Sequence, residues 1–261
     1  MSAILLEGAI VHYEVIGRGR PIVFLHGWIG SWRYWVPAMQ AASVSFRAYS
    51  LDLWGFGDTA HDAQRYNINT YVGLVKSFLE EMGIGKVAFI GHGLGGLVGL
   101  HFTRLYPQMV DRIMAVSVPL DVNMVAARMR TAPPAELADW LLSKDPAAEP
   151  ARVDALKADP QAIAASFLQP DTFNLANRIA AITTPTLLVY GQNDPAVPTP
   201  PFSPDLSPYN MHMITLDPAG HFPMLEDSAR FNRLLTDFLA LGSGDTPREL
   251  QMKEEWKRRV R

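Results

Sequence analysis

The sequence has no cysteine among its 261 residues and no large excess of either charge. Without cysteine, disulfide frameworks, thiolate zinc sites and a cysteine nucleophile are excluded. Lys and Arg number 23 against 26 Asp and Glu, which gives a formal net charge of −3. Since binding to a phosphate backbone needs a concentrated positive surface, we expect no nucleic-acid partner.

Long apolar runs are also missing, since none approaches the roughly 18 residues that a membrane-spanning helix requires. The first ten residues, MSAILLEGAI, carry no basic segment ahead of an apolar stretch, as a secretory signal peptide would. We therefore expect a cytoplasmic protein without membrane association. Its 48% of apolar residues can fill a sizeable core and exclude global disorder.

Short apolar runs alternate with helical patterns along most of the chain. Unbroken runs of this length are typical of parallel strands that are buried on both faces. Amphipathic patterns predict helices at 70–82, capped by Asn69 or Thr70, and at 94–105, and one apolar stripe predicts a last helix. The runs lie at 22–25, 48–53, 87–90, 113–118, 186–190 and 211–216, and the stripe contains Phe231, Leu234, Leu235, Phe238 and Leu239.

This order of elements predicts an α/β protein with a doubly wound, mostly parallel sheet and right-handed crossovers. Alternating segments at 4–6 and 10–16 predict an antiparallel N-terminal hairpin ahead of the parallel strands. We assign residues 1–118 and 183–241 to this core.

Two segments lie outside the predicted core. Residues 119–182 carry many prolines among short Ala-rich helical pieces. We expect them to form a helical cap, or lid, over the carboxyl ends of the strands, where open α/β sheets bind ligands. The pattern of residues 242–261 predicts a helical tail after a Gly-Ser-Gly joint. We expect its apolar stripe to dock on the body or on a second subunit, so a homo-oligomer is one of the alternatives. The stripe consists of Met252, Trp256 and Val260.

A strand turns sharply into a helix after Gly91, where the sequence reads Gly-His-Gly-Leu-Gly. Glycines at such a turn allow two backbones to approach closely. The setting is typical of a nucleophile elbow, G-x-S-x-G, but Gly93 stands at the position of the serine. The sequence therefore provides the elbow without its attacking hydroxyl.

Five stretches in a fixed order resemble motifs of the α/β-hydrolase superfamily, and the resemblance extends over residues 4–241. It implies an α/β-hydrolase fold and an esterase-like activity on a small apolar substrate, without a cofactor. The stretches are 25–28, like the oxyanion-hole loop; 52–58, like the D-x-x-G-x-G segment; the elbow at 91–95; 190–194, like the strand end with the triad acid; and 219–222, like the loop with the triad histidine.

The resemblance implies that Asp194 is the catalytic acid and His221 the catalytic base. In such a site the histidine removes a proton, and the carboxylate fixes its tautomer and stabilises its charged form. The backbone amides of Trp28 and Leu94 are expected to form the oxyanion hole. With Gly93 at the nucleophile position, ordinary ester hydrolysis is expected to be weak or absent. No metal is expected, because the histidines are scattered without ligand spacing.

These residues also have structural interpretations. Asn193-Asp194-Pro195 is a favourable turn sequence. Gly93 is also the residue that a strained turn prefers. His26 and His92 are expected to be structural, packing or bonding near the oxyanion loop and the elbow.

Two alternative assignments involve the same part of the chain. Gly91, Gly93 and Gly96 match the dinucleotide pattern G-x-G-x-x-G. Against this interpretation, the next strand, at 113–118, ends without an acid for a ribose. Ser117, at the end of that strand, is the other hydroxyl that stands as a candidate surrogate nucleophile.

Large apolar side chains gather in the predicted lid and in the loop after the first core strand. They either line a pocket for a hydrophobic small molecule or pack the lid against the sheet, and the pattern favours neither. They are Met124, Met129, Trp140, Leu141 and Phe167 in the lid, and Trp28, Trp32 and Trp35 in the loop.

Three functional hypotheses follow from these residues. The first is a hydrolase whose serine has been replaced. The second is an enzyme whose His221–Asp194 pair activates water or moves a proton without a covalent step. The third is a nonenzymatic protein that has kept the ligand site and lost the chemistry.

Overall fold

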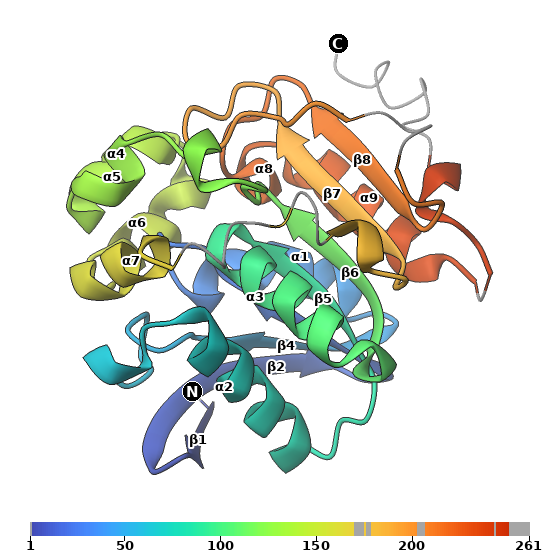
Figure 1. The fold of residues 1–261 in the computed structure, drawn as a ribbon, viewed down its shortest axis with the longest axis horizontal. Helices are drawn as coiled ribbons and strands as arrows, with labels where there is room; N and C mark the ends of the chain where they lie inside the picture. The colour runs from blue at the N-terminus through green and yellow to red at the C-terminus, as the bar shows by residue number, and fades with distance from the viewer. Residues whose placement is uncertain (1, 170–174, 176–178, 203–206, 243, 251–261) are drawn as a thin grey trace.

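The computed structural model describes residues 2–169, 175, 179–202, 207–242 and 244–250 of the chain (Figure 1). Among these residues, strands form one eight-stranded sheet in the order β1-β2-β4-β3-β5-β6-β7-β8. β1 pairs with β2, and β2 with β4, in antiparallel fashion, whereas the other neighbours are parallel. The predicted α/β sheet with its antiparallel N-terminal hairpin is confirmed. The strands are β1 (Ser2–Leu6), β2 (Ala9–Gly17), β3 (Arg20–Leu25), β4 (Phe46–Leu51), β5 (Val87–His92), β6 (Val110–Val116), β7 (Thr186–Gly191) and β8 (Met211–Leu216).

Helices cover both faces of this sheet, as a doubly wound order requires. In the view of Figure 1, α2 and α3 lie in front of the sheet and contact each other, whereas α1 and α9 contact each other behind it. These helices are α1 (Val36–Ala42), α2 (Ile68–Glu81), α3 (Gly93–Leu105) and α9 (Ser228–Ala240), with α8 (Pro223–Glu226) ahead of α9. Short 3₁₀ helices are η1 (Trp32–Trp35), η2 (Ala63–Arg65), η3 (Pro107–Met109), η4 (Val122–Met124), η5 (Pro146–Ala148), η7 (Ile179–Ala181) and η9 (Pro247–Glu249).

The start of α2 differs from the expected one by two residues. Asn67, and not Asn69 or Thr70, is the N-cap, and its side-chain oxygen accepts a hydrogen bond from the backbone amide of Thr70 at 3.0 Å. Asn67 has an extended backbone, at φ −147°, as an N-cap residue requires, whereas Asn69 and Thr70 already lie within the helix. The helix ends with Met82 as its C-cap, where the sequence predicted its end.

In the described part of the segment between β6 and β7, four α-helices group at the left of Figure 1. Prolines lie at the first or second position of three of these helices, where the missing backbone N–H costs no helical hydrogen bond. The group contacts the loop after β3, since Phe167 stacks on Trp28 and Asp154 accepts a hydrogen bond from Ser31. It therefore lies beside the carboxyl ends of the parallel strands. The helices are α4 (Arg128–Thr131), α5 (Pro134–Leu141), α6 (Glu149–Ala155) and α7 (Pro160–Phe167).

The beginning of the C-terminal tail is held against the body. Thr246 caps η9 and its hydroxyl donates to the backbone carbonyl of Tyr209 at 2.6 Å. The guanidinium of Arg248 donates to the carbonyl of Ser207 at 2.7 Å. The predicted apolar stripe of the tail, at 252–260, lies outside the described residues. Within the described ranges, no helix has both the length and the apolar character needed to span a membrane.

The apolar stripe of α9 is buried as predicted, with each of its five residues at most 2% exposed. We expect Leu235→Ala to lower the free energy of unfolding by about 2–5 kcal/mol, because the fully buried side chain leaves a cavity. Urea unfolding at equilibrium measures this change. The matched control is Arg233→Ala on the exposed side of the same helix, for which the change should stay within about 0.5 kcal/mol. Equal effects of the two substitutions would contradict the assigned face.

Candidate active site

The elbow lies where β5 meets α3, at the centre of the sheet. Gly93 has φ +47°, in the left-handed region that glycine adopts without strain. The neighbouring glycines are needed for packing, because a Cβ on Gly95 would overlap the backbone of Leu25 and one on Gly96 would overlap the side chain of Val118. Close contact of α3 with the strands therefore accounts for the glycine spacing without a dinucleotide.

The structure brings Asp194 and His221 together across two loops. Asp194 follows β7 and His221 lies between β8 and α8. The imidazole Nδ1–H donates to the carboxylate Oδ2 at 2.8 Å. Gly191 makes this approach possible, since a Cβ at that position would overlap the carbonyl oxygen of Gly220. The acid and base positions inferred from the sequence are thus in direct contact.

The surroundings favour the ionised form of Asp194. Burial by itself raises the pKa of this carboxyl, but the attraction and hydrogen bond of His221 outweigh that effect and hold the pKa below its ordinary value. The backbone amides of Ala196 and Val197 also donate to its Oδ1, at 2.8 and 3.0 Å. Because Nδ1 of His221 carries the proton shared with Asp194, Nε2 is the basic nitrogen, and it has no hydrogen-bond partner within the described parts of the chain.

Two side chains from the strand ends hold the backbone of His221. The Nε2–H of His92 and the hydroxyl of Ser117 both donate to the carbonyl oxygen of His221, at 2.9 and 3.3 Å. The Ser117 hydroxyl is therefore bonded to the main chain and not to the imidazole. This geometry points to a positioning role and away from the surrogate nucleophile that the sequence left open.

A chain of hydrogen bonds connects His92 to the oxyanion loop. The backbone N–H of Gly27 donates to the hydroxyl of Tyr34 at 2.6 Å, and this hydroxyl donates to Nδ1 of His92 at 3.0 Å. Burial, together with the neighbouring His221, holds the pKa of His92 well below its ordinary value, so the ring is neutral. A neutral ring with its proton on Nε2 fits both hydrogen bonds. The structural role expected for His92 is confirmed.

His26 has the same structural character. Its Nδ1–H donates to the carbonyl of Gly27 at 2.8 Å, and its Nε2 accepts from the amide of Leu53 at 3.0 Å. Sequence reasoning did not single out Tyr34. Its signal is its place in the aromatic run 32–35 after the oxyanion-like loop, but only the fold shows that its hydroxyl meets His92.

The two residues expected to supply oxyanion-hole amides flank the elbow. Trp28 lies in the loop after β3, and Leu94 is the second residue of α3. The indole of Trp28 stacks on Phe167 of α7 with ring centroids 4.9 Å apart, and its Nε1–H donates to the hydroxyl of Ser166 at 2.8 Å. Trp28 and His221 are 1% and 2% exposed, so both side chains are buried.

The other large apolar residues of the loop and the predicted lid have separate surroundings. Trp35 packs on Phe24 in the core, at 5.2 Å between centroids. Trp32 lies 5.6 Å from the ring of His12, and Arg128 lies over the half-buried ring of Trp140. Met129 and Leu141 are buried and Met124 is half-buried. Of these residues, Trp28 lies against Gly93 of the elbow, and Phe167 stacks on Trp28.

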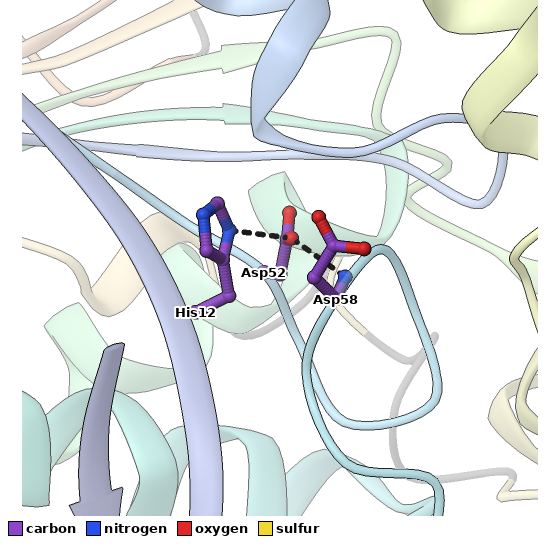
Figure 2. A group of neighbouring side chains, drawn as sticks. All are labelled: His12, Asp52 and Asp58. Carbon is purple, nitrogen blue, oxygen red and sulfur yellow. Dashed lines mark hydrogen bonds and ion pairs between the residues drawn. The ribbon is translucent and has the colours of Figure 1, made fainter. Parts of the chain in front are cut away.

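A second histidine–carboxylate group joins β2 to the loop that follows β4, with His12 on the strand and Asp52 and Asp58 on the loop (Figure 2). Asp52 accepts hydrogen bonds from Nδ1 of His12 at 3.0 Å and from the backbone amides of Trp32 and Asp58 at 2.8 and 3.1 Å. The carboxylate of Asp58 pairs with Lys157 at 2.8 Å. Both oxygens of Asp52 and one of Asp58 already have protein partners, so the group fits loop fastening better than metal binding.

The charges around His12 stabilise its protonated form. Burial lowers the pKa of His12, but the hydrogen bond to Asp52 and the charges of Asp52, Glu14 and Asp58 outweigh burial, and the pKa lies above its ordinary value. Nε2 of the ring lies 3.4 Å from the Glu14 carboxylate. A Cβ on Gly57 would overlap the carboxylate of Asp52, which explains the glycine in the 52–58 segment.

Comparisons with known proteins identify the family and the fold of the chain. The model of the Alpha/beta hydrolase family matches residues 22–234. The chain is 29% identical to the candidate carbamate hydrolase RutD of Stutzerimonas stutzeri, over 88% of this chain and 97% of that protein. It is 31% identical to a soluble epoxide hydrolase of Corynebacterium sp., over 44% of this chain and 40% of the relative. A solved hydrolase from Pseudomonas aeruginosa shares the fold, with a TM-score of 0.79, 20% identity, and coverage of 92% of this chain and 98% of its own.

Removal of the Tyr34 hydroxyl tests the connection between the oxyanion loop and His92. We expect Tyr34→Phe to lower the free energy of unfolding by about 1–3 kcal/mol, because the buried Gly27 amide and His92 Nδ1 both lose their partner. Denaturant unfolding measures the loss. Tyr13→Phe is the control, since within the described ranges the Tyr13 hydroxyl makes no hydrogen bond, and its effect should be smaller. A loss no larger than that of the control would contradict this network.

The raised pKa of His12 predicts a pH-dependent contribution to stability. Such a group stabilises the fold fully below its unfolded-state pKa, about 6.5, and the contribution is lost as pH rises through the folded-state value. We expect His12→Gln to lower the free energy of unfolding by about 1.5–3 kcal/mol at pH 5.5 and by less at pH 8.5. Urea unfolding at the two pH values, with the exposed His61→Gln as control, measures the difference. A deficit that is independent of pH would refute the assignment.

Proposed function

The chain belongs to the alpha/beta hydrolase family, and we propose that it acts on a small apolar ester or carbamate by general-base catalysis through His221. The observation that carries this proposal is the buried 2.8 Å hydrogen bond between His221 and Asp194 beside an elbow that has no hydroxyl. The pair fixes a basic Nε2, while Gly93 offers no atom that can form an acyl-enzyme. Water is then the nucleophile.

The proposed reaction uses groups that follow four strands, β3, β5, β7 and β8. Nε2 of His221 takes a proton from water as the water oxygen bonds to the carbonyl carbon, and Asp194 stabilises the resulting imidazolium. The backbone amides of Trp28 and Leu94 stabilise the negative charge on the carbonyl oxygen. The bond to the leaving group then breaks, and His221 returns its proton to that group.

The substrate class rests on chemistry and on likeness. An oxyanion hole favours a carbonyl that becomes tetrahedral, and esters and carbamates share this intermediate. The relative RutD is named for carbamate hydrolysis. The aromatic rings of Trp28 and Phe167 at the elbow favour an apolar substituent. We propose that residues 119–182 act as the cap, because α7 contacts Trp28 through Ser166 and Phe167.

A nonenzymatic ligand-binding protein is the second candidate. The observation in its favour is the burial of His221, at 2% exposure. Such a protein would keep the buried site and make no use of the basic nitrogen. The two candidates differ in whether the imidazole is needed.

The test compares wild type with His221→Ala and Asp194→Asn. With p-nitrophenyl acetate and phenyl carbamate as substrates, we expect turnover to fall about 10²–10⁴-fold in His221→Ala, since a general base contributes that much. Asp194→Asn should also reduce turnover, because the imidazole loses the partner that fixes its tautomer. The control His61→Ala, at an exposed histidine, should match wild type.

Two outcomes would contradict the proposal. Wild-type turnover that persists in a folded His221→Ala variant would show that His221 is not the base. Saturable binding of both compounds without turnover, unchanged in the two site variants, would favour the nonenzymatic candidate.

A further inference from the structure

We infer that Trp28 determines the reaction type of the site, because its indole occupies the space that a side chain at residue 93 needs. The inference deepens the proposed function and rests on it for the identity of the reacting site. Gly93 and Trp28 then form a matched pair. A serine introduced at residue 93 alone would not become a nucleophile.

The space beside Gly93 is measured by the position of a Cβ atom added to it. Such an atom would lie 2.9 Å from Cζ3 of the Trp28 indole, closer than real Cβ contacts allow, and 3.0 Å from Cε3, so the ring would have to shift by a few tenths of an ångström. The next atom, Cα of Gly27, is at an ordinary 3.6 Å. The obstruction is therefore the indole ring, and a serine hydroxyl adds one more heavy atom beyond the Cβ.

The ring has little freedom to move aside. Its Nε1–H donates to Ser166, whose hydroxyl donates in turn to the carbonyl of Ile163 at 2.6 Å. The indole ring is also held by its stack on Phe167, with an interplanar angle of 19°. Displacing the ring would break the hydrogen bond and the stack together and leave a buried indole N–H unpaired.

The backbone at the elbow does not explain the absence of a nucleophile by itself. Elbow residues are held at sparsely populated dihedrals, and Gly93 keeps such a conformation at φ +47°. The base pair of His221 and Asp194 is also assembled. Space at residue 93 is thus the missing condition for covalent catalysis, and Trp28, held by α7, denies that space.

The experiment gives the site a serine with and without the indole. Gly93→Ser, Trp28→Ala and the double variant are treated with a fluorophosphonate probe, and the adduct is located by intact mass and peptide mapping. In this reaction the serine oxygen bonds to phosphorus, fluoride leaves, and the serine proton passes to His221. We expect labelling at residue 93 in the double variant at a rate at least tenfold above that of Gly93→Ser, and none in Trp28→Ala.

Thermal unfolding supplies a second measurement that does not depend on reactivity. Gly93→Ala adds the Cβ without a hydroxyl, and we expect its loss of Tm to be smaller when Trp28 is alanine. Gly83 is the matched control, because its φ is +66° and nothing lies within 4 Å of an added Cβ. The loss of Tm in Gly83→Ala should be the same with either residue at position 28.

The possible outcomes separate this inference from the proposed function. Labelling of Gly93→Ser at the rate of the double variant would overturn the inference, as would an unlabelled double variant that unfolds cooperatively. If the double variant does not fold, equal losses of Tm for Gly93→Ala with and without Trp28 would overturn it. Wild-type turnover depends on His221 and tests the proposed function separately.

Discussion

The close approach of two loops at the carboxyl ends of β7 and β8 is the constraint on which the candidate site depends. Gly191 meets the carbonyl of Gly220 where a Cβ would overlap it. Only at this separation does the imidazole of His221 reach the carboxylate of Asp194. A buried carboxylate without a partner carries a large desolvation cost, so the fold that buries Asp194 also has to bring its partner close. The missing side chain of Gly191 thus allows both the close packing of the two loops and the contact between Asp194 and His221.

The second imidazole at the site is useful because it is neutral. His92 lies 4.7 Å from His221 between ring centroids, and two like charges at that distance would repel each other. Burial prevents His92 from taking up a proton, and the hydroxyl of Tyr34 fixes which nitrogen donates. His92 therefore holds the backbone of His221 without opposing its protonation. The network also ties the oxyanion loop, through Gly27, to the loop of the base.

How much of the structure could be predicted from the sequence depends on how far apart in the chain the interacting residues lie. Strands and helices were predictable because apolar periodicity is local, and the α2 cap was misplaced by two residues because Asn67 and Asn69 are equally good capping residues in sequence. The contact of Asp194 with His221 was inferred from motifs in a known order and not from spacing. The position of the Trp28 ring was not predictable, since it depends on a hydrogen bond to Ser166, 138 residues away.

Gly93 and Trp28 together disfavour a serine at residue 93. A serine at an elbow has to adopt strained dihedrals and needs open space beside its Cβ. Glycine adopts the same dihedrals without strain, and its missing side chain leaves an apolar gap at that place. An indole that fills this gap gains dispersion contacts and completes the stack with α7. With the indole in this place, a serine at residue 93 has to overcome the packing of the ring as well as the backbone strain. Under the proposed function, this packing belongs to a site that works without a covalent intermediate.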